Sequence, residues 1–419
     1  MNAQATAIGI STRSSIYRAL LVLLGLFTLF GIGFYILEIR SGASATSWGM
    51  LTTNFLFLMS ISHFGVCFVA VMRLCKAQWA KPFYRLGELV TLAFAPIAFV
   101  LLVSIYVFAR EDIFYWITAE DIHNPWLNET WLLYRNILGL AAFYGLTLWY
   151  FIVGLLPDLD TDMAERVSGW RKGLYRWLLS LKAGKDDASL KERAYKLSAW
   201  ILVMAVVANT IIAWDFGMMI YPHYHSTVFP MYYILGNIFA GTASLLVLFV
   251  IMSWFVPTGE YFSKSFNLRN MGTTLTAFSL LWLYFFWAQF FVTWFGNLPH
   301  EMRPLWKQLY GHYSIYFWAQ IICVLGIPLG FLVFAKVKKT LWPMILLSLT
   351  MAVGVWLNRY LTVMPALANE HEPFRVFSEV VLGFGLLAGF LFVLMYLFNV
   401  FPMLTMWEIR NIPQDVEHH

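Results

Sequence analysis

The sequence predicts an all-α, polytopic membrane protein with ten transmembrane helices. Of its 419 residues, 60% are hydrophobic and only 12% are charged. A soluble chain of this length needs many more charges to cover its surface. Apolar runs of about twenty residues, the length that crosses a bilayer as a helix, recur along the chain. Trp and Tyr gather at the ends of these runs, as they do at membrane–water interfaces.

The apolar runs define the elements in order. The first could instead be a cleaved signal peptide, because small residues follow it. It is longer than the apolar part of a typical signal peptide, so we predict a span. The ten predicted spans are residues 17–37, 50–74, 87–108, 132–156, 197–219, 231–255, 273–296, 311–336, 340–361 and 377–401.

The distribution of Lys and Arg orients these spans. Both terminal tails and the loops after spans 2, 4, 6 and 8 carry 21 of the 28 basic residues, and the opposite loops carry five. The remaining two, Arg135 and Arg359, lie inside spans. Basic residues favour the cytoplasmic side, so both termini are predicted to be cytoplasmic. The segment after span 5 then faces outward, toward the periplasm if the protein sits in a bacterial inner membrane.

One cytoplasmic segment, residues 157–196, is long. Basic residues alternate there with Trp and Leu in a helical pattern, which predicts an amphipathic helix on the lipid surface. The alternative is a loop that is basic only because it is cytoplasmic.

A faint internal repeat suggests how the spans are grouped. Residues 85–94 and 269–278 align without gaps and share an Arg and an Ala-Phe pair. This predicts two four-helix bundles, residues 50–219 (spans 2–5) and 231–361 (spans 6–9). Spans 1 (17–37) and 10 (377–401) flank them.

Two ionisable residues within the spans point to function. His63 lies about 20 Å below the outer start of span 2. Asp215 lies near the outer end of span 5. Such groups are costly in a bilayer and are therefore functional-site hypotheses. Arg135 lies close to an interface and could snorkel to water, whereas Glu88 has Arg85 one turn away and could form a structural ion pair.

The chain offers no ligand set for a haem or a metal. His63 is the only deep histidine, and a membrane haem usually needs two. The three cysteines are scattered and form no metal or cluster motif. The chemistry is therefore proton handling around a molecule that the bilayer supplies, or passage of a solute.

The chain carries a series of short motifs in this order: Ser62–Gly65, Arg85–Glu88 with Thr91, Gly154–Leu159, Asp215-Phe216, His225–Pro230, Gly236–Gly241, Trp294–Asn297 and Trp356–Tyr360. Together they resemble the NrfD/PsrC membrane subunits of polysulfide-reductase-type complexes. The resemblance covers residues 50–400 and is greatest to the ten-helix members: ActC and ActF of alternative complex III, and QrcD of the quinone reductase complex.

The resemblance implies a quinone site near the outer face, with menaquinone or ubiquinone as the bound substrate. It implies no haem or iron–sulfur cluster in this chain, which would not be catalytic alone. A periplasmic iron–sulfur subunit and a molybdopterin-type or multihaem subunit would be partners, beside the lipid bilayer, and nucleic acid would not.

The resemblance also assigns roles to residues. His63 and Asp215 become the first candidates to hydrogen-bond a quinone or exchange its protons. The remaining quinone-site candidates are Arg135, Asn136, His225 and Tyr232, and Glu88 with Arg85 resembles part of a proton route toward the cytoplasm.

Two departures from the family pattern bear on proton transfer. Asn136 and Asn358 stand where some relatives carry Asp and Glu, and an amide cannot pass a proton by titrating. Transmembrane proton pumping by that route is therefore in doubt, but quinone chemistry at the outer face is not. Two alternatives stay open: a proton or solute transporter without redox partners, and a membrane anchor.

Overall fold

The computed structural model describes residues 15–42, 45–118, 125–222, 224–255, 265–367 and 377–409. Within these ranges the chain is helical and has no strand. Ten helical segments are long and apolar enough to cross a membrane, which confirms the predicted polytopic all-α class. The spanning helices are α2 (Ser15–Ser41), α3 (Ala45–Leu74), α4 (Tyr84–Phe108), α6 (Glu129–Leu155), α9 (Asp187–Ala213), α10 (Phe229–Ser253), α11 (Ser265–Gly296), α13 (Ser314–Ile321) with α14 (Ile327–Leu332), α16 (Leu341–Leu367) and α17 (Phe377–Val400).

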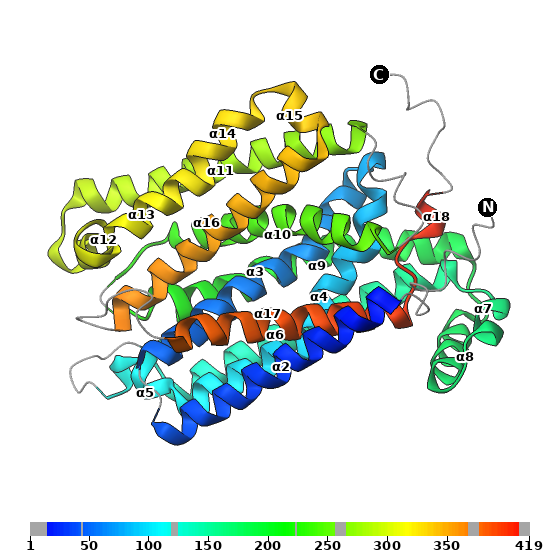
Figure 1. Ribbon diagram of the computed structural model, residues 1–419, viewed down its shortest axis with the longest axis horizontal. Helices are drawn as coiled ribbons and strands as arrows, with labels where there is room; N and C mark the ends of the chain where they lie inside the picture. The colour runs from blue at the N-terminus through cyan, green and yellow to red at the C-terminus, as the bar shows by residue number, and fades with distance from the viewer. Residues whose placement is uncertain are drawn as a thin grey trace.

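Helices α3 and α10 form the centre of the molecule (Figure 1). In their most apolar stretches, 89% of α3 and 78% of α10 is buried, against 6% of α2. Helix α3 contacts α4, α9, α10, α16 and α17. A polar side chain on α3 therefore faces protein rather than lipid, and it needs a protein partner or a bound molecule.

A pair of glycines allows α3 and α4 to pack closely. A Cβ atom on Gly65 would lie 2.6 Å from the carbonyl oxygen of Gly87, and one on Gly87 would lie 2.5 Å from that of Gly65. Only glycine fits at both positions, as is common where membrane helices cross. The same crossing fixes the part of α3 that carries His63.

We call α3, α4, α6 and α9 the N-terminal helix group, and α10, α11, α13 with α14, and α16 the C-terminal helix group. They correspond to the two predicted four-helix bundles. Helix α3 packs against α10 and α16 as well as against its own group. Helix α2 packs along α17. The division into two separate bundles stays a prediction.

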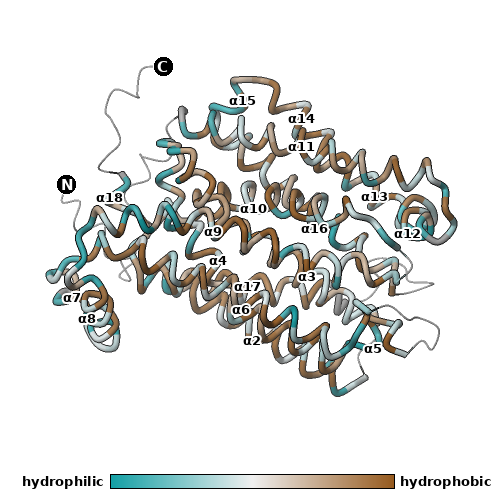
Figure 2. Tube along the Cα trace, turned by 180° about the vertical axis from the view of Figure 1, so that it is seen from behind, coloured by the Kyte–Doolittle hydropathy of each residue, from teal (hydrophilic) through white to brown (hydrophobic). Residues whose placement is uncertain are grey.

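The short helices lie at the two ends of the bundle, where the polar residues also gather (Figures 1 and 2). The α12 end carries α5 (Arg110–Ile113) and α12 (Pro299–Leu309). The α8 end carries α7 (Thr161–Arg166), α8 (Trp170–Lys182), α15 (Ala335–Lys339) and α18 (Met406–Ile409).

Helix α8 is the amphipathic helix expected between residues 157 and 196. It buries Tyr175 and Leu178 against the bundle, and the Tyr175 hydroxyl donates to the carbonyl of Val400 at 2.8 Å. Trp170 and Trp177 lie on the exposed face of α8, where they are 58% and 51% exposed. Contact of this face with lipid remains a prediction.

Two spans depart from regular α-helix. Helix α9 ends in a π-turn, η4 (Trp214–Met218), and α13 passes into a second one, η7 (Ile322–Gly326). Such turns insert an extra residue into a helix and are frequent at functional sites. The first of them contains Asp215.

Candidate functional site

Asp215 is held by four hydrogen bonds in the π-turn at the end of α9. Arg135 on α6 donates to both carboxylate oxygens, with Nε 2.7 Å from Oδ2 and Nη2 2.5 Å from Oδ1. Asn136 donates to Oδ2 at 2.6 Å, and the Trp126 indole donates to Oδ1 at 2.9 Å. A carboxylate offers about four acceptor positions, so this one is saturated.

The Arg135–Asp215 pair also fixes the chain that precedes α6. Arg135 donates to the carbonyl of Trp126 at 2.7 Å and lies 4.3 Å from the centre of its ring. Asp215 is 1% exposed. A bidentate pair with this many partners is stable and geometrically specific. The cluster therefore ties α6 and α9 together at the α12 end.

His63 lies deeper in the same helix group. It is 1% exposed and packs against Phe143 and Tyr144 of α6, with ring centres 4.3 and 5.3 Å away. Its Nδ1 atom is 3.1 Å from Oδ1 of Asn209 on α9. Asn209 precedes Asp215 by six residues, so the two predicted residues differ in depth by about 9 Å. Their side chains have different partners and do not form one site.

The hydrogen bonds around Asn209 fix the protonation of the His63 ring. The Asn209 amide nitrogen donates to the carbonyl of Ala205 at 2.8 Å, so its oxygen faces His63. The same oxygen accepts from the Asn237 amide nitrogen at 2.9 Å. Nδ1 of His63 must therefore carry the proton, and neutral Nε2 is left as an acceptor.

Nε2 of His63 has no hydrogen-bond partner within the part of the chain that is described, and it is buried. Buried polar atoms are nearly always bonded, so an exception requires an explanation. An imidazole nitrogen that carries a lone pair suits a ligand that donates a hydroxyl proton.

A chain of polar contacts runs from Asn209 into the C-terminal helix group. The Asn237 oxygen on α10 accepts from Nη2 of Arg359 at 2.6 Å and from the Ser60 hydroxyl at 2.6 Å. Arg359 on α16 also donates to the oxygen of Asn358 at 3.2 Å. The Asn358 amide nitrogen in turn donates to the Tyr232 hydroxyl at 2.6 Å.

Arg359 is a buried cation whose partners are neutral. It is 1% exposed, and no carboxylate of the described residues lies within 4.0 Å of it. It donates to the carbonyl of Tyr233 at 2.9 Å and lies 3.8 Å from the centre of that ring. Its hydrogen bonds and the ring face replace the counter-ion that a buried charge ordinarily needs.

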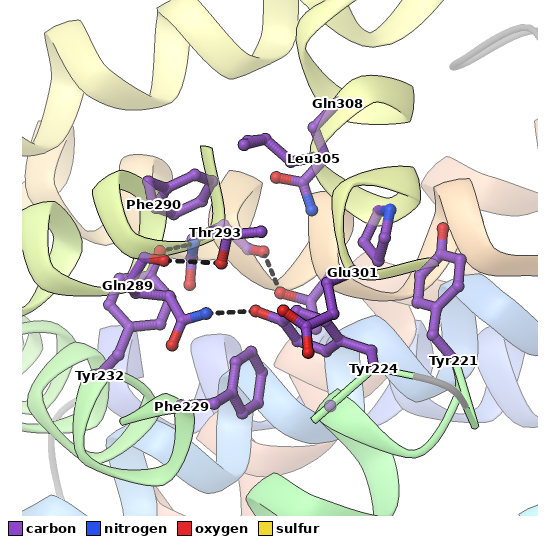
Figure 3. Close-up of a pocket in the computed structure, with 14 residues that line it drawn as sticks. Tyr221, Tyr224, Phe229, Tyr232, Gln289, Phe290, Thr293, Glu301, Leu305 and Gln308 are labelled. Carbon is purple, nitrogen blue, oxygen red and sulfur yellow. Dashed lines mark hydrogen bonds between the residues drawn. The ribbon is translucent and has the colours of Figure 1, made fainter. Parts of the chain in front are cut away.

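A cavity at the α12 end lies beside this series of polar contacts. It measures about 530 Å³, counting the space open to solvent, and lies between α10, α11, α12 and α16. Figure 3 shows Glu301 and Gln308 reaching in from α12, with Gln289 directed at Tyr224. Tyr232 and Asn358 line it, but His63 and Asp215 do not. Burial raises the pKa of the Tyr224 hydroxyl, which stays protonated.

The second predicted pair, Arg85 and Glu88, belongs to a buried cluster of charges at the α8 end. Nη1 of Arg85 is 2.9 Å from Glu88, and its Nη2 is 3.1 Å from Asp158. Nη2 of Arg73 is 3.6 Å from Glu88, and its Nε is 3.2 Å from Glu408. Every charge in the cluster has an opposite partner, as an ion-paired structural element requires.

The last helix, α18, closes this cluster from the α8 end. The backbone nitrogen of Trp407 donates to Asp158 at 2.9 Å, and its indole donates to the carbonyl of Gly154 at 3.0 Å. Glu408 is 8% exposed. The cluster is thus shared between α3, α4, the end of α6 and the C-terminal segment.

The structure therefore brings together some of the predicted residues and separates others. Arg135, Asn136 and Asp215 form one cluster, and Arg85 with Glu88 another. His63 and Tyr232 lie at opposite ends of a chain of amides, and His225 is exposed before α10. The sequence reasoning missed Asn209 and Asn237, because neutral amides in an apolar run carry no charge signal.

Within the described residues, no group of three or more His, Cys, Asp or Glu side chains is placed to hold a metal ion. A bundle of ten helical segments that are long and apolar enough to cross a membrane defines a polytopic membrane protein. The family model described as "Polysulphide reductase, NrfD" matches residues 40–369. The chain belongs to this family.

Two curated relatives are similar over most of this chain. A selenate reductase subunit of Mesobacillus selenatarsenatis is 21% identical over 342 residues, which are 78% of this chain and 76% of that protein. A putative dimethyl sulfoxide reductase membrane subunit of Halobacterium salinarum is 24% identical over 319 residues, 73% of this chain and 65% of that protein. Both names are those of reductase subunits, and the second is that of a membrane subunit.

Proposed function

We propose that this protein is the quinone-binding membrane subunit of a respiratory oxidoreductase in a bacterial inner membrane. It would exchange electrons and protons between a periplasmic partner and the quinone pool. The observation that carries the proposal is the unpartnered Nε2 atom of His63, buried among α3, α6 and α9. Membership of the NrfD family supports the redox role.

In this proposal His63 is the group that contacts the quinone. With its proton on Nδ1, the ring accepts the hydroxyl proton of a quinol at Nε2, and the Asn209 oxygen stabilises the resulting imidazolium. In the opposite direction the imidazolium returns the proton. Electrons would pass to or from iron–sulfur or haem groups of the partner subunits.

The cluster around Asp215 has a supporting role in this proposal. The carboxylate already accepts four hydrogen bonds, so it has no position left for a quinone hydroxyl. The Asn136 oxygen is buried without a partner among the described residues, and it is the one atom of this cluster free to accept a bond from a ligand. In this proposal the cluster holds α6 and α9 together at the α12 end. Roles for His225 and Tyr232 at the quinone remain predictions.

The test is quinone turnover by the complex purified with its partner subunits. We expect His63→Gln to lower turnover by about 10²- to 10⁴-fold, the usual contribution of a general acid–base group. Cys67→Ala is the matched control, because Cys67 is buried one turn further along α3. It should assemble and turn over quinone like the unmodified complex.

Two results would contradict the proposal. Unchanged turnover in the His63→Gln complex would remove His63 from the chemistry. Isolation of an active, colourless single subunit would favour a transporter, because a redox subunit should co-purify with iron–sulfur or haem absorbance.

A further inference from the structure

The tautomer of His63 depends on a residue in the other helix group. The Asn209 amide is oriented by Ala205 on one side and by Asn237 on the other. Asn237 could itself turn over, because the two ends of an amide have nearly the same shape. What prevents this is the neighbour on its far side, Arg359.

Arg359 sets the orientation of Asn237 because a guanidinium can only donate. Its Nη2 atom lies 2.6 Å from the Asn237 side chain, so the oxygen of that amide must face it. The Asn237 nitrogen then faces Asn209 and donates to it at 2.9 Å. The Asn209 oxygen consequently faces His63, and Nδ1 must be the protonated nitrogen.

The series of hydrogen bonds from Arg359 to His63 is not suited to conduct protons. Amide and guanidinium side chains neither release nor take up protons near neutral pH, and Asn209, Asn237 and Arg359 are all of these types. They are 4%, 3% and 1% exposed, which leaves little water to bypass them. The contacts are therefore suited to hold an orientation.

We propose that Arg359 is a positioning residue for His63: through Asn237 and Asn209 it holds the imidazole with its proton on Nδ1 and its Nε2 acceptor free. A buried cation within a membrane-spanning helix is costly, and fixing the reactive histidine explains its presence. The mechanistic value of this inference rests on the proposed function, but the tautomer itself can be measured independently.

Asn237→Asp is the sharpest test, because it keeps the shape of the side chain and replaces the amide donor that faces Asn209 with an acceptor. The new carboxylate keeps its contact with Arg359, is charged there and can only accept. If Asn237 sets the orientation, Asn209 turns its nitrogen toward the carboxylate and gives up its bond to the carbonyl of Ala205. His63 then accepts at Nδ1 and carries its proton on Nε2. We expect the tautomer to switch and quinone turnover to fall by about 10²-fold or more.

The tautomer is read from the ¹⁵N shifts of His63 in the complex labelled with ¹⁵N-histidine. Protonated and unprotonated ring nitrogens are well separated, and the His63→Gln complex identifies the signals that belong to His63. Asn358→Asp is the control, since it places the same charge beside Arg359 but at Nη1, whereas Asn237 contacts Nη2. It should leave the His63 shifts unchanged.

Arg359→Gln tests the source of the orientation directly, and we expect a mixture of both tautomers. If this variant does not assemble, the tautomer measured in Asn237→Asp alone tests the inference. Retention of the Nδ1-protonated ring in Asn237→Asp would overturn the inference, as would unchanged His63 shifts in an assembled Arg359→Gln complex. A switched tautomer with unchanged turnover would uphold the inference and overturn the proposed role of His63 at the quinone.

Discussion

Asp215 and His63 were predicted to serve one site, yet their surroundings differ in a way that separates their roles. Asp215 accepts hydrogen bonds from Arg135, Asn136 and Trp126, and both of its oxygens are occupied. His63 makes one hydrogen bond, to Asn209, and its second nitrogen has no partner within the described chain. Both side chains are equally buried, at 1% exposure.

This difference teaches that burial of an ionisable group does not by itself mark a reaction site. A buried charge with all its partners in place resists change, because breaking any contact leaves an uncompensated charge. A buried group with one partner missing can bind a ligand without losing anything. The full set of partners therefore indicates a structural role for Asp215. The unpartnered nitrogen of a ring that can take up a proton makes His63 the candidate for chemistry.

The largest effect on stability is expected at the saturated site. Asp215→Asn removes the charge that balances Arg135, whose side chain is 12% exposed, and should destabilise the protein by about 3–5 kcal/mol. Thermal unfolding of the purified complex measures this loss, and turnover per assembled complex should change little. A stable variant with abolished turnover would reverse the comparison and return the chemistry to Asp215.

Much of this architecture could be predicted from the sequence, because long apolar runs and charge asymmetry report directly on a bilayer. The ten spans and the pairing of Arg85 with Glu88 follow from spacing alone. The saturation of Asp215 could not be predicted, because Trp126 reaches it from a loop distant in sequence and the π-turn has no sequence signature.

The series of polar contacts that ends at His63 could not be predicted from the sequence for a different reason. Asn209 and Asn237 lie in separate apolar helices, and only the packing of α3, α9 and α10 brings them together. Arg359 was recognised as an ionisable group inside a span, but its neutral partners depend on three-dimensional contacts that spacing cannot report.

The charge cluster at the α8 end extends the comparison to a second site, in which each charge has an opposite partner within 4.0 Å. Glu408→Gln removes one of two carboxylates near Arg73, and Glu88 remains 3.6 Å away. We therefore expect the free energy of unfolding to fall by about 3 kcal/mol, the lower end for a broken buried ion pair. The melting temperature of the complex should fall while quinone turnover stays constant. A selective loss of turnover would instead place this cluster on a proton route.

A smaller effect is expected when a single donor is removed from Asp215. Trp126→Phe keeps an aromatic ring beside Arg135 but deletes the indole N–H that bonds the carboxylate at 2.9 Å. Hydrogen bonds to charged groups contribute about 1.5–3 kcal/mol. The melting temperature should fall by less than in Asp215→Asn. An equal or larger fall would mean that the loop before α6, rather than the ion pair, dominates this end of the molecule.

The smallest effect is expected beside His63 itself. Ser62 donates to the carbonyl of Thr91 at 3.1 Å, so the Tyr144 hydroxyl, also 3.1 Å away, is the donor in their contact. Tyr144→Phe removes that bond but keeps the ring that packs on His63, and should cost about 0.5–1.5 kcal/mol. Turnover should remain close to that of the unmodified complex, measured alongside His63→Gln. A loss as large as that of His63→Gln would show that the phenol takes part in proton exchange, and the missing partner of Nε2 would then not be enough to single out the reacting group.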